Sequence, residues 1–262
     1  MTRIIFLGTG GGRFATIYQI RSTGGIYISD GRNLNIDPGP GALTNMNRLG
    51  LDPARTDAVL VSHCHPDHYA NAEVLVEGMT MGGIKRRGLL VGSLSVMKGI
   101  DRIGPAISGY HRSLPADSLT VEPGDSFEIG DMDILATHTK HTDPSGVGFR
   151  LSTSNGTISY VSDSELDQGV VNEHRDSRVL ILSLTRPRSA RVRFHLCTED
   201  AIDFIKGCTP EIVLLTHMGA ALINEGADLQ AGIIEEATGV RTLAAEDLMK
   251  VSVGKRIRAS RP

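Results

Sequence analysis

Residues 63–68 read His63-Cys64-His65-Pro66-Asp67-His68, directly after a run, residues 57–62, that predicts a buried strand. His63 and His65 are two positions apart, so on extended backbone their side chains point the same way. Pro66 ends the strand, and Asp67 and His68 follow where a helix over residues 69–80 is predicted to begin. Two imidazoles facing one side, and a carboxylate with a third imidazole facing another, suit two adjacent divalent ions.

The composition describes a globular chain without a dominant charge signal. Of 262 residues, 40% are hydrophobic and 22% charged, and the formal net charge of −3 excludes a broadly basic protein that coats nucleic acid. The three cysteines lack a disulfide-framework pattern, which favours a reducing compartment and hence the cytoplasm. No stretch approaches the run of about 18 apolar residues that a membrane span requires.

Short apolar runs alternate with turn residues and a few helical stretches. The strands are predicted over residues 3–8, 26–30, 34–37, 58–62, 89–92, 119–121, 126–129, 132–138, 148–152, 157–162, 179–184 and 212–216. The helices are predicted over residues 41–49, 69–80, 94–103, 198–207 and 228–238, with Thr198 as an N-cap. Asn155-Gly156 predicts a hairpin turn. No linker divides the chain, so we expect one α/β domain, residues 1–262, with sheets covered by helices.

Four further polar residues stand near the ends of predicted strands. Asp37, Asp163 and His217 each end or follow an apolar run, and His141 lies between the strands over 132–138 and 148–152. A turn or capping role is ordinary for any one of them. Together with the hexapeptide they indicate further ligands of the same site.

These residues, in order along the chain, resemble the five motifs of the metallo-β-lactamase superfamily. The resemblance covers about residues 3–219 and implies a four-layer αβ/βα sandwich with two mixed sheets and the site at one edge. It implies that one metal is held by His63, His65 and His141, that the other is held by Asp67, His68 and His217, that Asp163 bridges them, and that Asp37 orients a histidine ligand. His138 competes with His141 for the third motif, and His141 is favoured because it lies nearer the following strand. Zinc is the favoured metal, with manganese, iron and nickel as alternatives, because nitrogen and oxygen ligands accept all four.

The opening residues 5–10 and the segment 195–201 resemble the RNase Z and cyclic-phosphodiesterase branch of that superfamily. The resemblance implies that His195 lies near a scissile phosphate, which makes it the candidate general acid; a helix-capping histidine is the alternative. Asp67 is expected to orient the nucleophile while ligating. Asp163 stands where true β-lactamases carry a cysteine. A basic exosite arm is lacking, and residues 142–145 depart from the loop usual in tRNA nucleases, so a small or cyclic phosphodiester is favoured as substrate.

Four arginines, Arg186, Arg188, Arg191 and Arg193, run into His195 and are candidate substrate contacts, since guanidinium suits phosphate. A solvated surface loop is the alternative reading of this run. Residues 78–124 are a candidate lid, in which His111 is a weaker candidate for reaching substrate. The basic tail, residues 253–262, is expected to be mobile.

The resulting hypothesis is a binuclear metal-dependent phosphodiesterase that acts through a metal-bridging hydroxide on a small anionic substrate. The alternatives are a carbonyl-ester hydrolase such as a lactonase or thioesterase, an RNA-processing endonuclease, and a di-iron redox module. Nucleic acid is not favoured as a partner and no membrane partner is expected. A homodimer is a candidate assembly, because many relatives in the superfamily are dimers.

Overall fold

The computed structural model describes residues 1–262, whose strands form two mixed sheets. In spatial order, the eight-stranded sheet contains β15 (Ile257–Ser260), β14 (Lys250–Val253), β1 (Thr2–Phe6), β2 (Ile26–Ser29), β3 (Asn33–Ile36), β4 (Ala58–Val61), β5 (Leu89–Ser93) and β6 (Asp117–Val121). The seven-stranded sheet contains β13 (Arg241–Ala244), β12 (Ile212–Thr216), β11 (Val179–Ser183), β10 (Gly156–Val161), β9 (Val147–Thr153), β8 (Met132–His138) and β7 (Ser126–Ile129).

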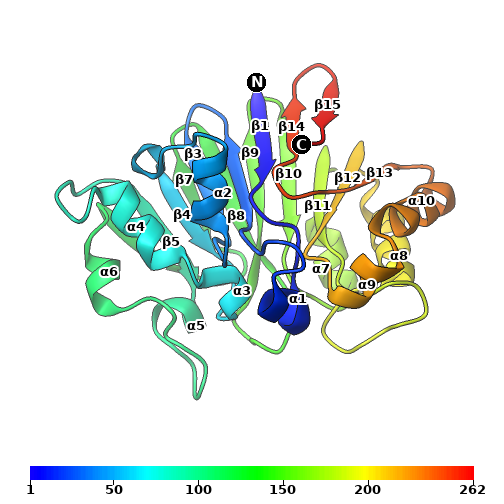
Figure 1. Ribbon diagram of the computed structural model, residues 1–262, viewed down its shortest axis with the longest axis horizontal. Coiled ribbons are helices and arrows are strands. Elements are labelled where there is room, and N and C mark those ends of the chain that lie inside the picture. Colours follow the sequence, from blue (N-terminus) through cyan, green and yellow to red (C-terminus); the bar gives the residue numbers. More distant parts are fainter.

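Helices lie on either side of the paired sheets, which gives the four layers of an αβ/βα sandwich (Figure 1). On the side of the eight-stranded sheet are α2 (Ala42–Arg48), α4 (Ala72–Thr80), α5 (Leu94–Met97) and α6 (Gly109–Ser113). On the side of the seven-stranded sheet are α7 (Gln168–Glu173), α8 (Thr198–Cys208), α9 (Ala220–Glu225) and α10 (Ala227–Thr238). The short helices α1 (Gly12–Tyr18) and α3 (Pro66–Tyr69) lie between the two sides in Figure 1, and a 3-10 turn spans η1 (Pro53–Arg55). The fold class predicted from the sequence is confirmed.

The alternation of side chains along each strand explains why both faces of each sheet are apolar. In β4, Ala58 and Leu60 join a cluster of 28 buried residues between the sheets, whereas Val59 and Val61 pack under the helices. Because a strand points successive side chains to opposite faces, a continuous apolar run is buried on both sides. The cluster between the sheets draws on both of them, which favours the single domain expected from the sequence.

The sheet topology collects strand ends at one edge of the sandwich. Strands β3, β4 and β5 are parallel neighbours in one sheet, and β10, β11 and β12 are parallel neighbours in the other. Parallel neighbours end at the same edge, so the residues that follow these strands are brought together.

Three sequence predictions need correction. The helix predicted over 94–103 ends at Met97, because Gly99 adopts a positive φ of 83° and Ile100 bridges back to Ile103. The candidate lid, residues 78–124, contributes β5 and β6 to the eight-stranded sheet and therefore is not a lid as a whole. The tail is likewise part of that sheet, since β15 pairs with β14, and the prediction that residues 253–262 are mobile is wrong.

Smaller differences concern helix ends. The helix predicted over 69–80 is two helices, α3 and α4, and the N-cap of α8 is Cys197 rather than Thr198, with Asp200 completing a capping box. The hairpin predicted at Asn155-Gly156 is confirmed between β9 and β10. None of the helices combines the length and apolar character needed to cross a membrane.

Candidate metal centre

The hexapeptide follows β4 and presents its polar side chains into the edge where the strand ends meet. His63 and His65 precede Pro66, which is the first residue of α3, and Asp67 and His68 occupy the first turn of this helix. A proline is favoured at this position because its missing N–H has no intrahelical partner there. The change from strand to helix therefore turns Asp67 and His68 away from the direction of His63 and His65.

One group of candidate ligands combines the hexapeptide with the β8–β9 loop and the end of β10. His63, His65, His141 and Asp163 each place one ligand-type atom within 4.8 Å of the others. His63 Nε2 lies 3.0 Å from His65 Nδ1, which lies 3.2 Å from His141 Nε2. Three of the four side chains are buried, so the nitrogens converge in a site shielded from water.

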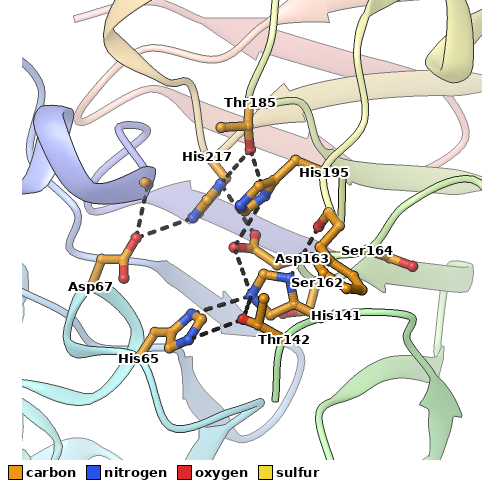
Figure 2. A network of polar contacts seen from close by, with 12 residues as sticks. His65, Asp67, His141, Thr142, Ser162, Asp163, Ser164, Thr185, His195 and His217 are labelled. Carbon is orange, nitrogen blue, oxygen red and sulfur yellow. Dashed lines mark hydrogen bonds and ion pairs between the residues drawn. The ribbon is translucent and has the colours of Figure 1, made fainter. Parts of the chain in front are cut away.

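A second group lies beside the first and contains Asp67, His68 and His217. His217 Nε2 is 3.2 Å from Asp67 Oδ2, and His68 Nε2 is 3.9 Å from the same oxygen. Asp163 connects the two groups, because its Oδ2 lies 3.8 Å from His141 Nε2 (Figure 2) and 3.8 Å from His68 Nε2. The arrangement is that of two adjacent sites which share one carboxylate.

The hydrogen bonds of the imidazoles determine which nitrogen faces the site. His141 Nδ1 lies 3.0 Å from the carbonyl oxygen of Phe194, and His68 Nδ1 lies 2.8 Å from Asp37 Oδ2. Since both partners only accept, both Nδ1 atoms carry a proton and both Nε2 atoms face the site. A carboxylate or carbonyl behind each histidine is the usual support of a metal ligand.

Asp37 is the centre of a buried polar network behind the site. Its carboxylate accepts hydrogen bonds from the backbone N–H and hydroxyl of Ser62, from His68 and from the hydroxyl of Tyr160. Ser62 Oγ also lies 3.0 Å from His63 Nδ1. A single carboxylate thus orients one histidine directly and a second one through Ser62.

Burial and charge leave most of these side chains in the protonation state that binds metal. Burial lowers the pKa of His63 and His65, and lowers the pKa of His141 to about 4, so these imidazoles are neutral near pH 7. Burial alone would raise the pKa of Asp163, but the neighbouring His217 and His68 hold it well below the ordinary value. Neutral imidazole and ionised carboxylate are the ligating forms.

His68 provides the clearest test of whether a cation fits the site. Burial disfavours its charged form, yet Asp37 and Asp67 raise its pKa well above the ordinary value. His68 Nε2 is buried without a hydrogen-bond partner, 3.9 Å from Asp67 Oδ2 and 3.8 Å from Asp163 Oδ2. An orphaned imidazole nitrogen that faces two carboxylates is what a divalent ion would satisfy, so the residues fit such ions.

His195 lies at the same site without belonging to either ligand group. Its Nδ1 is 3.7 Å from Asp163 Oδ2 and 3.4 Å from Thr185 Oγ, which also lies 3.0 Å from His217 Nδ1 (Figure 2). The His195 ring is stacked on that of His217, with centroids 6.2 Å apart. Burial lowers its pKa, which favours the neutral ring.

The four arginines before His195 are separated by the structure. Arg191 and Arg193 line a hollow of about 670 Å³ that also contains His195, whereas Arg186 and Arg188 lie outside it. Arg191 is ion-paired with Asp200, and Arg193 stacks over Phe194 without a carboxylate within ion-pairing distance. Arg193 is therefore the one guanidinium in the hollow without an ion pair, although Glu165, Asp200 and Asp203 line the same hollow.

The other histidines and Cys64 lie apart from the ligand groups. His138, the competitor of His141, is exposed and paired with Glu173, and His111 lies between Glu73 and Glu77. Cys64 lies 3.2 Å from the position that a Cβ at Gly104 would take, in the packing under α4. None of these three offers an atom to the two groups.

Sequence reasoning missed several residues that support the site. Thr185 follows β11 as the candidate ligands follow their strands, but its hydroxyl is not a typical metal ligand and so gave no signal. The backbone N–H of Gly12 donates to Asp67 Oδ2 at 2.9 Å. A Cβ at Gly11 would lie 2.2 Å from the His217 ring, so this backbone must be glycine. The run Gly10-Gly11-Gly12 was the available sign of such a close approach.

Comparison with known sequences places this geometry in a family. The profile of the beta-lactamase superfamily domain matches residues 32–218. An uncharacterised protein of Methanocaldococcus jannaschii is 43% identical over 253 residues, which are 95% of this chain and 94% of that protein. Ribonuclease Z of Methanosarcina acetivorans is 26% identical over 152 residues, 58% of this chain and 48% of that enzyme. The chain thus spans about half the length of this ribonuclease Z.

Comparison with solved structures agrees on the fold. The metallo-beta-lactamase fold protein YhfI from Bacillus subtilis has a TM-score of 0.78 at 17% identity, with 99% of both chains covered. A diphosphatase from the PhnP family has a TM-score of 0.71 at 15% identity, covering 96% of this chain and 98% of that one. The short form of human tRNase Z also has a TM-score of 0.71, at 19% identity, covering 96% and 99%. At these identities the likeness establishes the fold alone.

Proposed function

The chain belongs to the beta-lactamase superfamily and has the metallo-beta-lactamase fold, and from this premise we propose that it is a two-metal hydrolase of a small phosphodiester. The observation that carries the proposal is the position of His195, which lies against both ligand groups and opens onto the hollow containing Arg193. A proton donor beside a two-metal centre, with an unpaired arginine in reach, suits an anionic substrate and an oxygen leaving group.

The seven ligand-type side chains divide between two ions. His63, His65 and His141 would hold one, Asp67, His68 and His217 would hold the other, and Asp163 would be shared. Such a pair of bound ions supplies a water of lowered pKa and offsets charge on the phosphoryl oxygens. The ligand set accepts zinc, manganese, iron or nickel, and zinc is the first choice for imidazole-rich sites.

The chain itself contributes orientation and a proton. The hydroxyl of Thr185 can donate to His195 Nδ1, which leaves the His195 proton on Nε2. Asp67 accepts from the backbone of Gly12 with the same oxygen that lies near His217, so its carboxylate is held in one orientation. A phosphodiester beside His195 would add negative charge and favour the protonated ring, which then donates its proton to the departing oxygen.

The hollow limits the size of the substrate and offers one unpaired guanidinium. Its volume of about 670 Å³ lies within the ordinary range of small-molecule pockets, about 300–1,000 Å³. Arg191 is already paired with Asp200, so phosphate recognition is assigned to Arg193.

RNA processing is the second candidate function. It is favoured by the similarity to ribonuclease Z and by the same diester chemistry. A carbonyl ester is the third candidate, because the two-metal centre can serve attack on either electrophile. These candidates differ in substrate but not in the residues that hold the ions.

The experiment compares bis(p-nitrophenyl) phosphate, p-nitrophenyl phosphate, a 2′,3′-cyclic nucleotide and a simple lactone, with protein loaded with manganese or zinc. We expect diester hydrolysis to be lost in His65→Ala, lowered by about 10²–10⁴ in His195→Ala, and unchanged in the control His138→Ala. The defect of His195→Ala should be larger for the cyclic nucleotide, whose alkoxide needs a proton, than for p-nitrophenolate. Activity confined to the lactone, or insensitivity to His195→Ala, would refute the proposal.

A further inference from the structure

A carboxylate outside both ligand groups is buried between the two loops that carry three of the candidate ligands. Asp143 is fully buried and lies two residues after His141. Its Oδ2 accepts the backbone N–H of Cys64 at 2.9 Å and the hydroxyl of Ser95. Its Oδ1 accepts the backbone N–H and the hydroxyl of Ser145, both at 3.0 Å. Four donors therefore converge on one buried carboxylate.

The bond to Cys64 is the one that reaches the site. Cys64 is the residue between His63 and His65, so its peptide sets the direction of both imidazoles. A second tie lies alongside, because the backbone N–H of Val147 donates to the carbonyl of Ser62 at 3.1 Å. The segment that follows His141 is thereby fastened to the segment that carries His63 and His65.

The surrounding packing leaves little freedom for these two segments to shift. Ser145 Oγ accepts the backbone N–H of Ser95 at 3.0 Å, which ties the first turn of α5 to the same loop. A Cβ at Gly146 would lie 2.9 Å from Thr139 Oγ1 and 3.4 Å from His63 Cβ. The backbone of this loop is therefore packed directly against the histidine it helps to place.

We propose that Asp143 is a positioning residue for the first metal group, which holds the His63–His65 segment and the His141 loop in the register that lets their nitrogens converge. The proposal rests on the metal centre of the proposed function but not on the identity of the substrate. It also gives a role to residues 142–145, the segment that differs from the loop usual in tRNA nucleases.

The variant Asp143→Asn tests the proposal at nearly constant volume. Asparagine has one acceptor oxygen in place of two, so its amide nitrogen must face either Cys64 and Ser95 or Ser145, all of which donate. The matched control is Asp57→Asn, because Asp57 precedes the opposite end of β4 and also accepts a backbone N–H, that of Asn33 at 2.9 Å. Metal-free protein of each variant is titrated with Co²⁺ or Mn²⁺, and the visible absorption of the cobalt form is recorded.

We expect one of the two ions to bind at least about tenfold more weakly in Asp143→Asn, with a changed cobalt spectrum, and the other ion to bind as in the unmodified protein. Asp57→Asn should bind both ions normally even where its unfolding midpoint falls. Wild-type affinity and an unchanged spectrum in folded Asp143→Asn would show that the residue supports only the fold, which overturns the proposal.

A second variant covers the case in which Asp143→Asn does not fold. Ser95→Ala removes one donor to Asp143 Oδ2 and leaves the bond from Cys64, so a loss of about threefold in the affinity of the same ion is expected. Unchanged affinity in Ser95→Ala would overturn the proposal. An unmodified protein that binds no ions would overturn both this inference and the proposed function, whereas two bound ions without diester hydrolysis would overturn the proposed function alone.

Discussion

Replacing Asp37 by asparagine should change the tautomer of His68 while leaving the shape of the site nearly unchanged. Asp37 adopts a positive φ of 52°, a conformation that asparagine tolerates, so the backbone is not strained by the change. Its Oδ1 accepts the Ser62 N–H at 2.6 Å, and asparagine can keep that bond with its remaining oxygen. The amide nitrogen then takes the place of Oδ2, which faces His68 Nδ1 at 2.8 Å and the Tyr160 hydroxyl at 2.6 Å.

This exchange reverses the direction of the hydrogen bond to His68. The amide of Asn donates, so His68 Nδ1 must accept and the proton moves to Nε2, the atom that would bind the ion. Loss of a supporting partner of this kind weakens metal binding by about 10–100-fold. The Tyr160 hydroxyl and the Ser62 hydroxyl, which lies 2.7 Å from Oδ2, also lose their charged acceptor. Their loss lowers the free energy of unfolding of the metal-free protein by about 2–4 kcal/mol.

The assay has two parts, a urea titration in the presence of a chelator and a cobalt titration that resolves the two ions. Tyr160→Phe is the matched control, since it removes one donor to Asp37 and leaves the tautomer of His68 unchanged. It should lower the free energy of unfolding by about 1–2 kcal/mol without changing metal affinity. If Asp37→Asn binds both ions as tightly as the unmodified protein, the argument from the tautomer is refuted.

Removing the bound ions with a chelator should lower the free energy of unfolding by about 2.7 kcal/mol for each ion, relative to protein with free ion at a hundredfold excess over Kd, and an unchanged urea midpoint would count against a metal centre. His174 is fully buried, and its burial, together with the nearby charge of Arg150, lowers its pKa to about 3. This pKa lies below that of a histidine in the unfolded chain, so the folded state favours the neutral ring. Its contribution to stability is therefore complete above about pH 6.5 and is lost toward pH 3, by about 1.4 kcal/mol per pH unit. His174→Phe should therefore flatten the acid limb of stability measured by urea titration between about pH 4 and pH 7, and an equally steep limb would contradict the assignment. Gly11→Ala would place a methyl group 2.2 Å from the His217 ring and should weaken binding of the ion held by Asp67, His68 and His217. The control Gly232→Ala, in open space on α10, should leave metal binding intact and stabilise the protein by about 0.5–1 kcal/mol. Equal metal affinity in both variants would show that the close approach of Gly11 to His217 does not matter for metal binding.

Residue type and local spacing were enough to find the candidate ligands and the fold class. The apolar runs that form β4, β11 and β12 are continuous, because both faces of these strands are buried, and each ends at a polar residue. Strands of this kind are recognisable without knowing their neighbours. The metal-binding motif is likewise local, because six consecutive positions contain two imidazoles two residues apart, a proline and an Asp-His pair.

The C-terminal strands were not predicted because their sequences show only a weak pattern of apolar residues. Strands β13, β14 and β15 have four residues each and mix polar with apolar side chains. Val251, Val253 and Ile257 become buried only because β14 adds to the edge of the sheet beside β1. A short segment of this composition forms a strand because it pairs with neighbouring strands, and its own β propensity is too weak to predict it.

Residue chemistry and the period of the apolar pattern were sufficient to identify the candidate metal ligands, the buried strands and the helix-covered sheets. The tertiary structure was needed to see how these ligands are supported. Asp37 meets Tyr160 across 123 positions of sequence, and Asp143 meets Cys64 across 79. It also decided that Arg191 is neutralised by Asp200 while Arg193 stays free. A sequence does not show whether a carboxylate or a guanidinium is ion-paired. Its role depends on the groups that lie against it in the folded protein.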